Sequence, residues 1–284
     1  MVKYLALTLS VIFAALGVLY FFIGVPKVYR EYYPDVSIPH AYNDPSRAIS
    51  EIRVTAFYFV PQSKAKSIIS NWREVLEENL QKLEKFHALQ FQGKSSLKYQ
   101  IFPEPVVGLQ DSVYYDTDNT GGGNPHALLR TASEIEQRVF RPSGDIRHED
   151  FSLREKNVYP VLFILYEGVG ASGGIIYESE LESEREIAEK LGIPESIIFK
   201  IDVEAADGFF LLSSAYLARP ELRSYGASVM VHEFYHTLGL PDKYEVEEPT
   251  FEERILSPDL MGAGRKRPLE KTYLERAAIR GFGL

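Results

Sequence analysis

The sequence contains no cysteine, which excludes disulfide bonds, thiolate zinc sites, iron–sulfur clusters and a cysteine nucleophile. Positive charge is also in deficit, because 31 Lys and Arg stand against 40 Asp and Glu, giving a net charge of −9 and a pI near 5.3. This sign disfavours nucleic acid as a partner, since binding phosphates over a broad surface requires basic residues. Any metal ion must be held by histidine, aspartate or glutamate.

Glycine and proline are too few for a fibrous or low-complexity chain, at 20 and 16 of 284 residues. Hydrophobic residues make up 45% and charged residues 25%, as in ordinary globular proteins. The length is enough to bury a full core. With no internal repeat, we expect one catalytic domain, residues 51–284.

Charged residues are missing from Tyr4 to Val25, a run of 22 residues. A helix of that length spans roughly 33 Å, enough to cross a bilayer. The run ends in large side chains with no small-x-small cleavage triplet, so residues 1–25 predict an uncleaved transmembrane signal-anchor. Residues 26–50 then form a juxtamembrane connector. Basic residues flank both ends of the run, so charge does not set its orientation.

Hydrophobic periodicity predicts strands that alternate with helices, and hence an α+β domain with a mixed, mostly parallel sheet. The expected strands are 51–60, 97–101, 158–166, 175–177 and 209–215. The expected helices are 63–89, 125–140, 180–191, 220–238 and 269–279. Residues 158–166 are almost continuously apolar, which places them at the centre of the sheet. The strand at 175–177 follows a glycine-rich break and is expected at an edge of the sheet, where it can pair antiparallel.

The stretch from 231 to 245, VHEFYHTLGLPDKYE, carries the chemistry. His232 and His236 are four residues apart in a helical context, so both imidazoles lie on one face and can bind one ion, with Glu233 beside them. Gly239 can end the helix in a left-handed conformation and turn the chain back. Asp242 then reaches the same ion. The spacing therefore predicts a metal site formed by His232, His236 and Asp242.

With this spacing the sequence resembles the metzincin metalloproteases, whose usual pattern is H-E-x-x-H-x-x-G-x-x-H with a Met-turn downstream. An aspartate as third ligand, here Asp242, is shared by the snapalysin-like peptidases. The string HEFYHTLGLPDKYE is similar to the immune inhibitor A peptidases of bacteria. Met261 stands where the Met-turn, the floor under the metal, is expected. Some members carry a tyrosine two residues after that methionine, where this chain has Ala263.

The resemblance implies a three-layer zincin-like fold with an active-site helix and one zinc ion per chain. It also implies a zinc endopeptidase acting on proteins or peptides, with Glu233 as general base for a zinc-activated water. Tyr244 either hydrogen-bonds a ligand or the tetrahedral intermediate, or is a surface aromatic. We expect the catalytic domain outside the cytoplasm, where an unregulated protease does least harm. If the N-terminal segment is cleaved, the protein is secreted.

Two alternatives stay open. The chain can be an inactive protease-like protein that binds peptides or serves as a scaffold on the same fold. It can also be a gluzincin-type metallopeptidase, whose third ligand is a glutamate from a later helix. The candidates for that glutamate are Glu253, Glu270 and Glu275. Close to the histidines, Glu245 and Glu247 compete with Asp242.

The other polar clusters are less specific. Asp116, Asp118 and Asn119, followed by glycines 121–123, form either a calcium site or, as the favoured interpretation, a solvated turn. The remaining histidines lie outside ligand spacing and are expected to be ordinary surface residues. They are His40, His87, His126 and His148.

Overall fold

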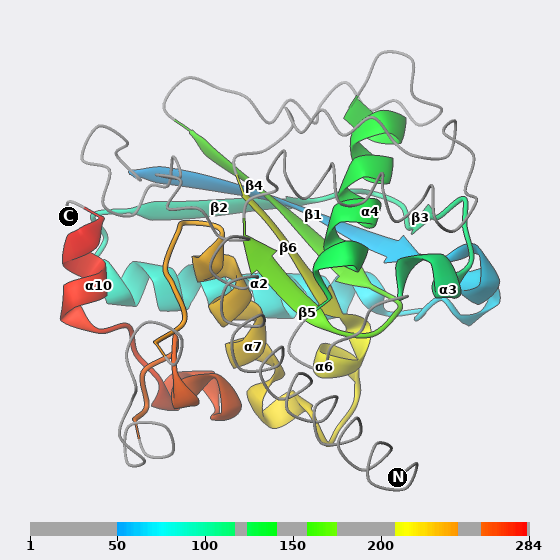
Figure 1. Cartoon of the computed structure of the whole chain (residues 1–284). Coiled ribbons are helices and arrows are strands. Elements are labelled where there is room, and N and C mark those ends of the chain that lie inside the picture. The colour runs from blue at the N-terminus through cyan, green and yellow to red at the C-terminus, as the bar shows by residue number, and fades with distance from the viewer. Residues whose placement is uncertain (1–49, 117–123, 141–157, 175–207, 244–256, 283–284) are drawn as a thin grey trace, which may run out of the picture. The chain divides into compact units, whose positions relative to one another are not determined.

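The core of the protein is a six-stranded sheet with the order β2-β1-β4-β6-β5, in which β3 extends the β2 edge by pairing with β1 (Figure 1). All pairs are parallel except β5 with β6. The strands are β1 (Glu51–Val60), β2 (Ser96–Ile101), β3 (Val106–Val107), β4 (Tyr159–Tyr166), β5 (Ala171–Gly174) and β6 (Gly208–Ser213). The computed structural model describes residues 50–116, 124–140, 158–174, 208–243 and 257–282, all within one compact unit, His40–Leu284.

Helices cover both faces of this sheet (Figure 1). The principal helices are α2 (Trp72–Gln90), α4 (Pro125–Ile135) and α7 (Arg223–His236). The short helices are α3 (Ser112–Tyr115), α6 (Ser214–Ala218) and α10 (Arg276–Gly281). Tighter or wider turns of helix are η1 (Gln62–Ser67), η2 (Glu136–Phe140), η3 (Ala263–Lys266) and η4 (Leu269–Lys271). The chain is thus an α+β protein with a mixed, mostly parallel sheet, as predicted.

The strand β4 lies at the centre of the sheet and is buried along its whole length. Its side chains alternate between two apolar clusters. Phe163 and Leu165 pack with residues of α2 and α7, whereas Leu162 and Ile164 pack with residues of α4. This two-sided burial explains why the segment is almost continuously apolar, and it confirms the predicted position.

One expected helix begins later than the periodicity predicts, and another keeps its predicted extent but changes type along its length. The expected helix 63–89 begins only at Trp72, because η1 has no buried residue and the chain becomes extended at Ile68. The expected helix 125–140 begins at Pro125, where the Asn124 side chain accepts a hydrogen bond from the Ala127 amide at 3.2 Å. It ends in the wider turn η2.

Near the end of the chain the predicted helix 269–279 is wrong. Residues 269–271 form η4, and α10 begins only at Arg276. Between them the backbone is extended and forms hydrogen bonds with other segments of the chain. The Tyr273 carbonyl accepts from the Leu260 amide at 2.8 Å, and the Leu274 amide donates to Oε1 of Gln90 at 2.9 Å. These tertiary hydrogen bonds override the local helical pattern.

The antiparallel edge strand exists, but it is formed by the residues predicted to break the chain. Gly173 belongs to β5, and a Cβ atom there would lie 2.1 Å from the carbonyl oxygen of Glu233 in α7. Only glycine permits this close approach of strand and helix. The predicted strand 175–177, helix 180–191 and transmembrane segment 1–25 lie outside the described residues. Among the residues that the structure describes, no helix is long and apolar enough to cross a membrane.

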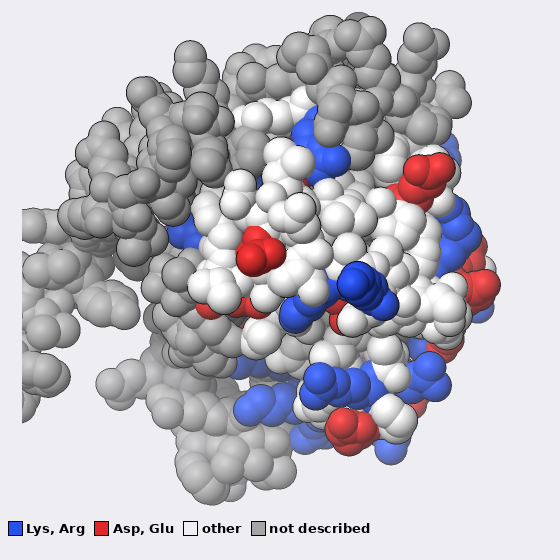
Figure 2. Space-filling view, turned by 90° about the vertical axis from the view of Figure 1, so that its right-hand side faces the viewer, with Lys and Arg blue, Asp and Glu red and all other residues white. Residues whose placement is uncertain are grey.

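The surface carries both signs of charge. On the face seen from the right-hand side of Figure 1, basic and acidic side chains are interspersed among uncharged ones (Figure 2). Among the described residues, that face therefore shows no continuous acidic area.

The structure corrects the expectation for His87, which is fully buried between α2 and α7. Its Nε2 atom lies 2.8 Å from Oγ of Ser95, and its Nδ1 atom lies 3.2 Å from the hydroxyl of Tyr235. Its ring stacks on Phe91 with centroids 4.4 Å apart. In the sequence, His87 follows Leu83 by four residues and so continues the apolar stripe of the helix, a signal that favours burial.

We expect His87 to make the free energy of unfolding depend on pH. Burial lowers the pKa of this imidazole from 6.5 to about 4. The unfolded chain therefore binds a proton at a higher pH than the folded chain does, so stability present above pH 6.5 is lost as the pH falls towards 4. The full loss is about 3 kcal/mol.

Urea unfolding of the wild type and of His87→Gln at pH 4.5, 5.5 and 7 measures this loss. The variant should lose less stability than the wild type over that range, because glutamine does not titrate. His126→Gln is the matched control, since His126 lies half-buried at the start of α4. Equal pH dependence in the wild type and His87→Gln would contradict the prediction.

Candidate metal centre

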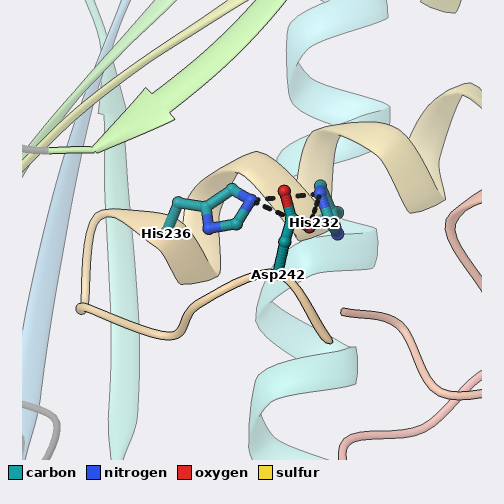
Figure 3. A group of neighbouring side chains, drawn as sticks. All are labelled: His232, His236 and Asp242. Atoms are coloured by element: carbon teal, nitrogen blue, oxygen red, sulfur yellow. Dashed lines mark hydrogen bonds and ion pairs between the residues drawn. The ribbon is translucent and has the colours of Figure 1, made fainter. Parts of the chain in front are cut away.

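The two histidines of the motif lie on α7 as the spacing predicts (Figure 3). Phe234 and Tyr235, between them in the sequence, are fully buried in the core shared with α2, which fixes the rotation of the helix. His232 and His236 then share the opposite face, one turn apart. Their Nε2 atoms lie 3.1 Å from each other.

A tight turn ends α7 and returns the chain to these histidines. Gly239 has φ +92°, in the left-handed region. The Gly239 amide donates to the His236 carbonyl at 3.0 Å, and the Leu240 amide donates to the Tyr235 carbonyl at 3.2 Å. These two bonds form a Schellman motif, the helix end that glycine favours. The predicted role of Gly239 as the helix-ending residue is therefore confirmed.

The turn brings Asp242 to the two imidazoles. Its Oδ1 atom lies 3.2 Å from Nε2 of His232 and 3.6 Å from Nε2 of His236. One ligand atom from each of the three side chains lies within 4.8 Å of the others. Within the described ranges, this is the one group of such side chains that could hold a metal ion. The ligand set predicted from the spacing is thus brought together.

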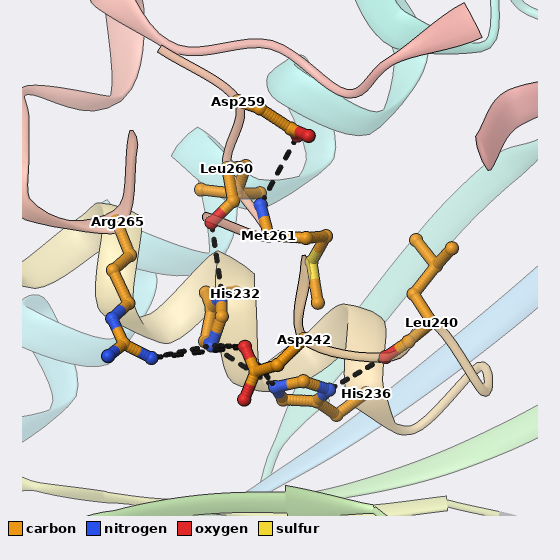
Figure 4. Close-up of polar contacts among 8 residues, drawn as sticks. All are labelled: His232, His236, Leu240, Asp242, Asp259, Leu260, Met261 and Arg265. Carbon is orange, nitrogen blue, oxygen red and sulfur yellow. Dashed lines mark hydrogen bonds and ion pairs between the residues drawn. The ribbon is translucent and has the colours of Figure 1, made fainter. Parts of the chain in front are cut away.

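Backbone carbonyls fix both imidazole rings (Figure 4). Nδ1 of His232 donates to the Leu260 carbonyl at 3.0 Å, and Nδ1 of His236 donates to the Leu240 carbonyl at 2.7 Å. Because a carbonyl oxygen only accepts, each Nδ1 carries a proton, and in a neutral imidazole Nε2 then presents a lone pair. Two such lone pairs and a carboxylate oxygen at these distances can bind one cation together. The donor set therefore fits a metal ion.

The predicted Met-turn holds the site from the C-terminal side. Leu260 and Met261 are buried, and the Gly262 amide donates to the Asp259 carbonyl at 3.1 Å. The carbonyl of Met261 accepts from the Lys243 amide at 3.2 Å. One short turn thus contacts both His232, through the Leu260 carbonyl, and the residue that follows Asp242.

The glutamates of the gluzincin alternative do not join this group. Glu275 forms an ion pair with Lys243, which also pairs with Asp259. Glu270 is exposed on η4. The structure places neither with the two histidines. Tyr244, Glu245, Glu247 and Glu253 lie outside the described residues.

Glu233 lies one residue after His232 and is half-buried. Burial raises its pKa above the ordinary value for a glutamate, and this outweighs the opposing influence of His232, His236 and Arg265. Asp242 responds in the opposite direction. Burial would raise its pKa, but the adjacent imidazoles of His232 and His236 hold the pKa well below the usual range. Glu233 thus has the greater proton affinity, which suits a base, while Asp242 stays ionised as a ligand must.

Arg265 is a site residue that the sequence analysis did not identify. It lies on η3, four residues after Met261, and its Nη1 atom is 3.4 Å from Nε2 of His232 and 3.9 Å from Oδ1 of Asp242 (Figure 4). The sequence signal that could have identified Arg265 is its position two residues after Ala263. Ala263 stands at the position where some metzincins carry a tyrosine.

The described part of the calcium candidate has a structural explanation. Oδ1 of Asp116 accepts hydrogen bonds from the Tyr166 hydroxyl at 2.9 Å and from the Val169 amide at 3.2 Å. This carboxylate therefore ties the end of α3 to the segment after β4. Asp118, Asn119 and glycines 121–123 lie outside the described residues.

Neither a scan against protein-family models nor a search of curated proteins finds a match to this chain.

Proposed function

We propose that this chain is a zinc-dependent endopeptidase built on a zincin-like fold of the metzincin type. The observation that carries the proposal is the convergence of His232, His236 and Asp242, with both Nδ1 atoms bound to carbonyls and Glu233 beside the ligands. Three protein ligands leave a fourth position for water, which is the arrangement of catalytic rather than structural zinc sites.

The donor atoms favour zinc over the hard cations. Two imidazole nitrogens and one carboxylate oxygen form a mixed set, whereas magnesium and calcium prefer oxygen ligands. Zinc accepts imidazole and carboxylate equally in tetrahedral sites. We therefore infer one zinc ion per chain.

In the proposed reaction, bound zinc would polarise the substrate carbonyl and lower the pKa of a water towards about 7. Glu233 would accept the proton of the attacking water. It then gives the proton to the leaving amine. His232 and His236 are held in orientation by the Leu260 and Leu240 carbonyls, so the ligand geometry persists through the cycle.

The sheet edge next to α7 supports an extended peptide as substrate. Among the described strands, β5 is the last in the sheet, and Gly173 lies directly against the backbone of Glu233. A peptide that paired with the outer edge of β5 would run past the residue proposed as the base.

The proposal includes a location. The uncharged run from Tyr4 to Val25 is long enough to anchor the chain, so we propose a single-pass membrane protein with its catalytic domain outside the cytoplasm. Secretion remains the outcome if that run is cleaved.

One experiment tests the peptidase activity, the zinc content and the membrane attachment together. Membranes that contain the full-length chain are washed with high salt, which does not release a protein held by buried apolar area. The protein extracted from them should contain one zinc per chain and digest casein, and a chelator should abolish the digestion. Zinc-loaded, folded protein that digests nothing would favour the inactive scaffold. Activity in the wash instead of the membranes would overturn the anchor alone.

A further inference from the structure

We propose that Arg265 is a catalytic residue that donates a hydrogen bond to the oxyanion of the tetrahedral intermediate. This inference rests on the proposed function and adds a residue to its chemistry. It starts from the position of the guanidinium group, whose Nη1 atom lies within 3.9 Å of ligand atoms of both His232 and Asp242.

The group is positioned from a fixed turn. The Gly264 amide donates to the Asp259 carbonyl at 2.8 Å, and a Cβ atom on Gly264 would lie 2.4 Å from that same oxygen. On the other side of Arg265, the Arg267 carbonyl accepts a hydrogen bond from the Ser228 hydroxyl of α7. Arg265 thus lies between two backbone contacts that dock η3 onto the metal centre. Its side chain is 30% exposed, so solvent and substrate can reach it.

Charge gives Arg265 a chemical role. An aspartate as third ligand brings one negative charge that a third histidine would not bring. This charge lowers the Lewis acidity of a bound metal ion towards a substrate oxygen. The guanidinium of Arg265 returns one positive charge beside the same atoms. Donors aimed at the oxygen that becomes negative are the most effective form of electrostatic catalysis.

Hydrolysis of one peptide bond at this site proceeds through a tetrahedral intermediate. The water oxygen forms a bond to the carbonyl carbon, and the carbonyl π pair moves onto its oxygen, which becomes the oxyanion. Glu233 takes one water proton. When the carbon–nitrogen bond breaks, the electron pair on the oxyanion re-forms the carbonyl, the pair of the broken bond goes to nitrogen, and nitrogen receives the proton from Glu233. Arg265 donates its hydrogen bond to the oxyanion while the tetrahedral intermediate lasts, and it stays protonated.

Inorganic phosphate, a tetrahedral anion, tests this role without requiring turnover. The variants are Arg265→Met, which removes the charge, and Arg265→Lys, which keeps it. Lys266→Met is the matched control, because Lys266 is the exposed neighbour on the same turn. Zinc affinity is measured by chelator competition, and phosphate binding to the zinc-loaded chains is measured by calorimetry. Casein digestion is followed in parallel.

We expect Arg265→Met to bind zinc at least as tightly as the wild type, since a like charge has been removed. It should bind phosphate at least about tenfold more weakly and digest casein about 10²-fold more slowly. Arg265→Lys should recover part of both losses, and Lys266→Met should match the wild type. If Arg265→Met does not fold, Arg265→Lys and Arg265→Gln supply the comparison.

Two results overturn the role of Arg265 alone. One is a tenfold loss of zinc affinity in Arg265→Met, which makes the residue a support for the ligands. The other is unchanged phosphate binding in a wild type that digests casein. A wild-type chain that binds zinc and phosphate but digests nothing overturns the proposed function instead.

Discussion

Glu233→Gln is expected to lower peptide hydrolysis by about 10²- to 10⁴-fold while zinc stays bound. The amide has nearly the shape of the carboxylate but cannot accept a proton from water. Glu233 is not among the three side chains whose ligand atoms converge, so its replacement leaves them in place. The casein digestion rate and the zinc content of the same sample measure the two halves of this prediction.

Glu270→Gln is the control for Glu233→Gln, because it makes the same chemical change at an exposed position on η4. It should leave the digestion rate unchanged. Near-wild-type turnover by Glu233→Gln would assign the base to another group. Loss of zinc in Glu233→Gln would instead mean that the carboxylate helps to bind the ion.

Asp242→Ala should weaken zinc binding by a factor of ten or more. Substitution of a residue that hydrogen-bonds a metal ligand typically lowers metal affinity 10- to 100-fold, and loss of a ligand itself should lower it at least as much. The Oδ1 atom of Asp242 faces both Nε2 atoms, so its removal leaves two ligands. Asp242→His should retain zinc, because imidazole is an equally good zinc ligand. Chelator competition measures each affinity.

Glu245→Ala and Glu247→Ala are the matched controls for Asp242→Ala, since they remove the two nearby carboxylates that compete for the role. Both should bind zinc like the wild type. Should Asp242→Ala keep zinc while one of them, or a variant at Glu253, Glu270 or Glu275, loses it, the proposed ligand set is wrong. The gluzincin alternative would then replace it.

The convergence of His232, His236 and Asp242 could be predicted from the sequence because it depends on local geometry. The helical repeat alone places His232 and His236 on one face, and a glycine three residues later is enough to turn the chain towards Asp242. The central strand of the sheet could also be predicted from the sequence, since a strand covered on both faces must be apolar at every position.

Residues that act through distant contacts could not be predicted in the same way. Arg265 lies 33 residues from His232 in sequence, and it reaches the site only because η3 docks on α7. His87 is fully buried through a contact with Tyr235, 148 residues away. The glycines of β5 are predicted to break the chain, because nothing local in the sequence indicates that α7 lies directly against Gly173. Each case needed the tertiary arrangement.

All three ligand side chains lie within eleven residues, from His232 to Asp242, and the strands contribute none. Mutations in this protein should therefore divide into two phenotypic classes. Changes to the apolar residues of β1, β4 and β6 should alter how much folded protein accumulates, whereas each molecule that does fold should retain the proposed activity. Changes to the polar side chains of the site, such as Glu233, Asp242 and Arg265, should leave abundance closer to normal and alter the proposed activity of each molecule. A screen that records protein level and activity separately would distinguish variants that destabilise the sheet from variants that alter the site.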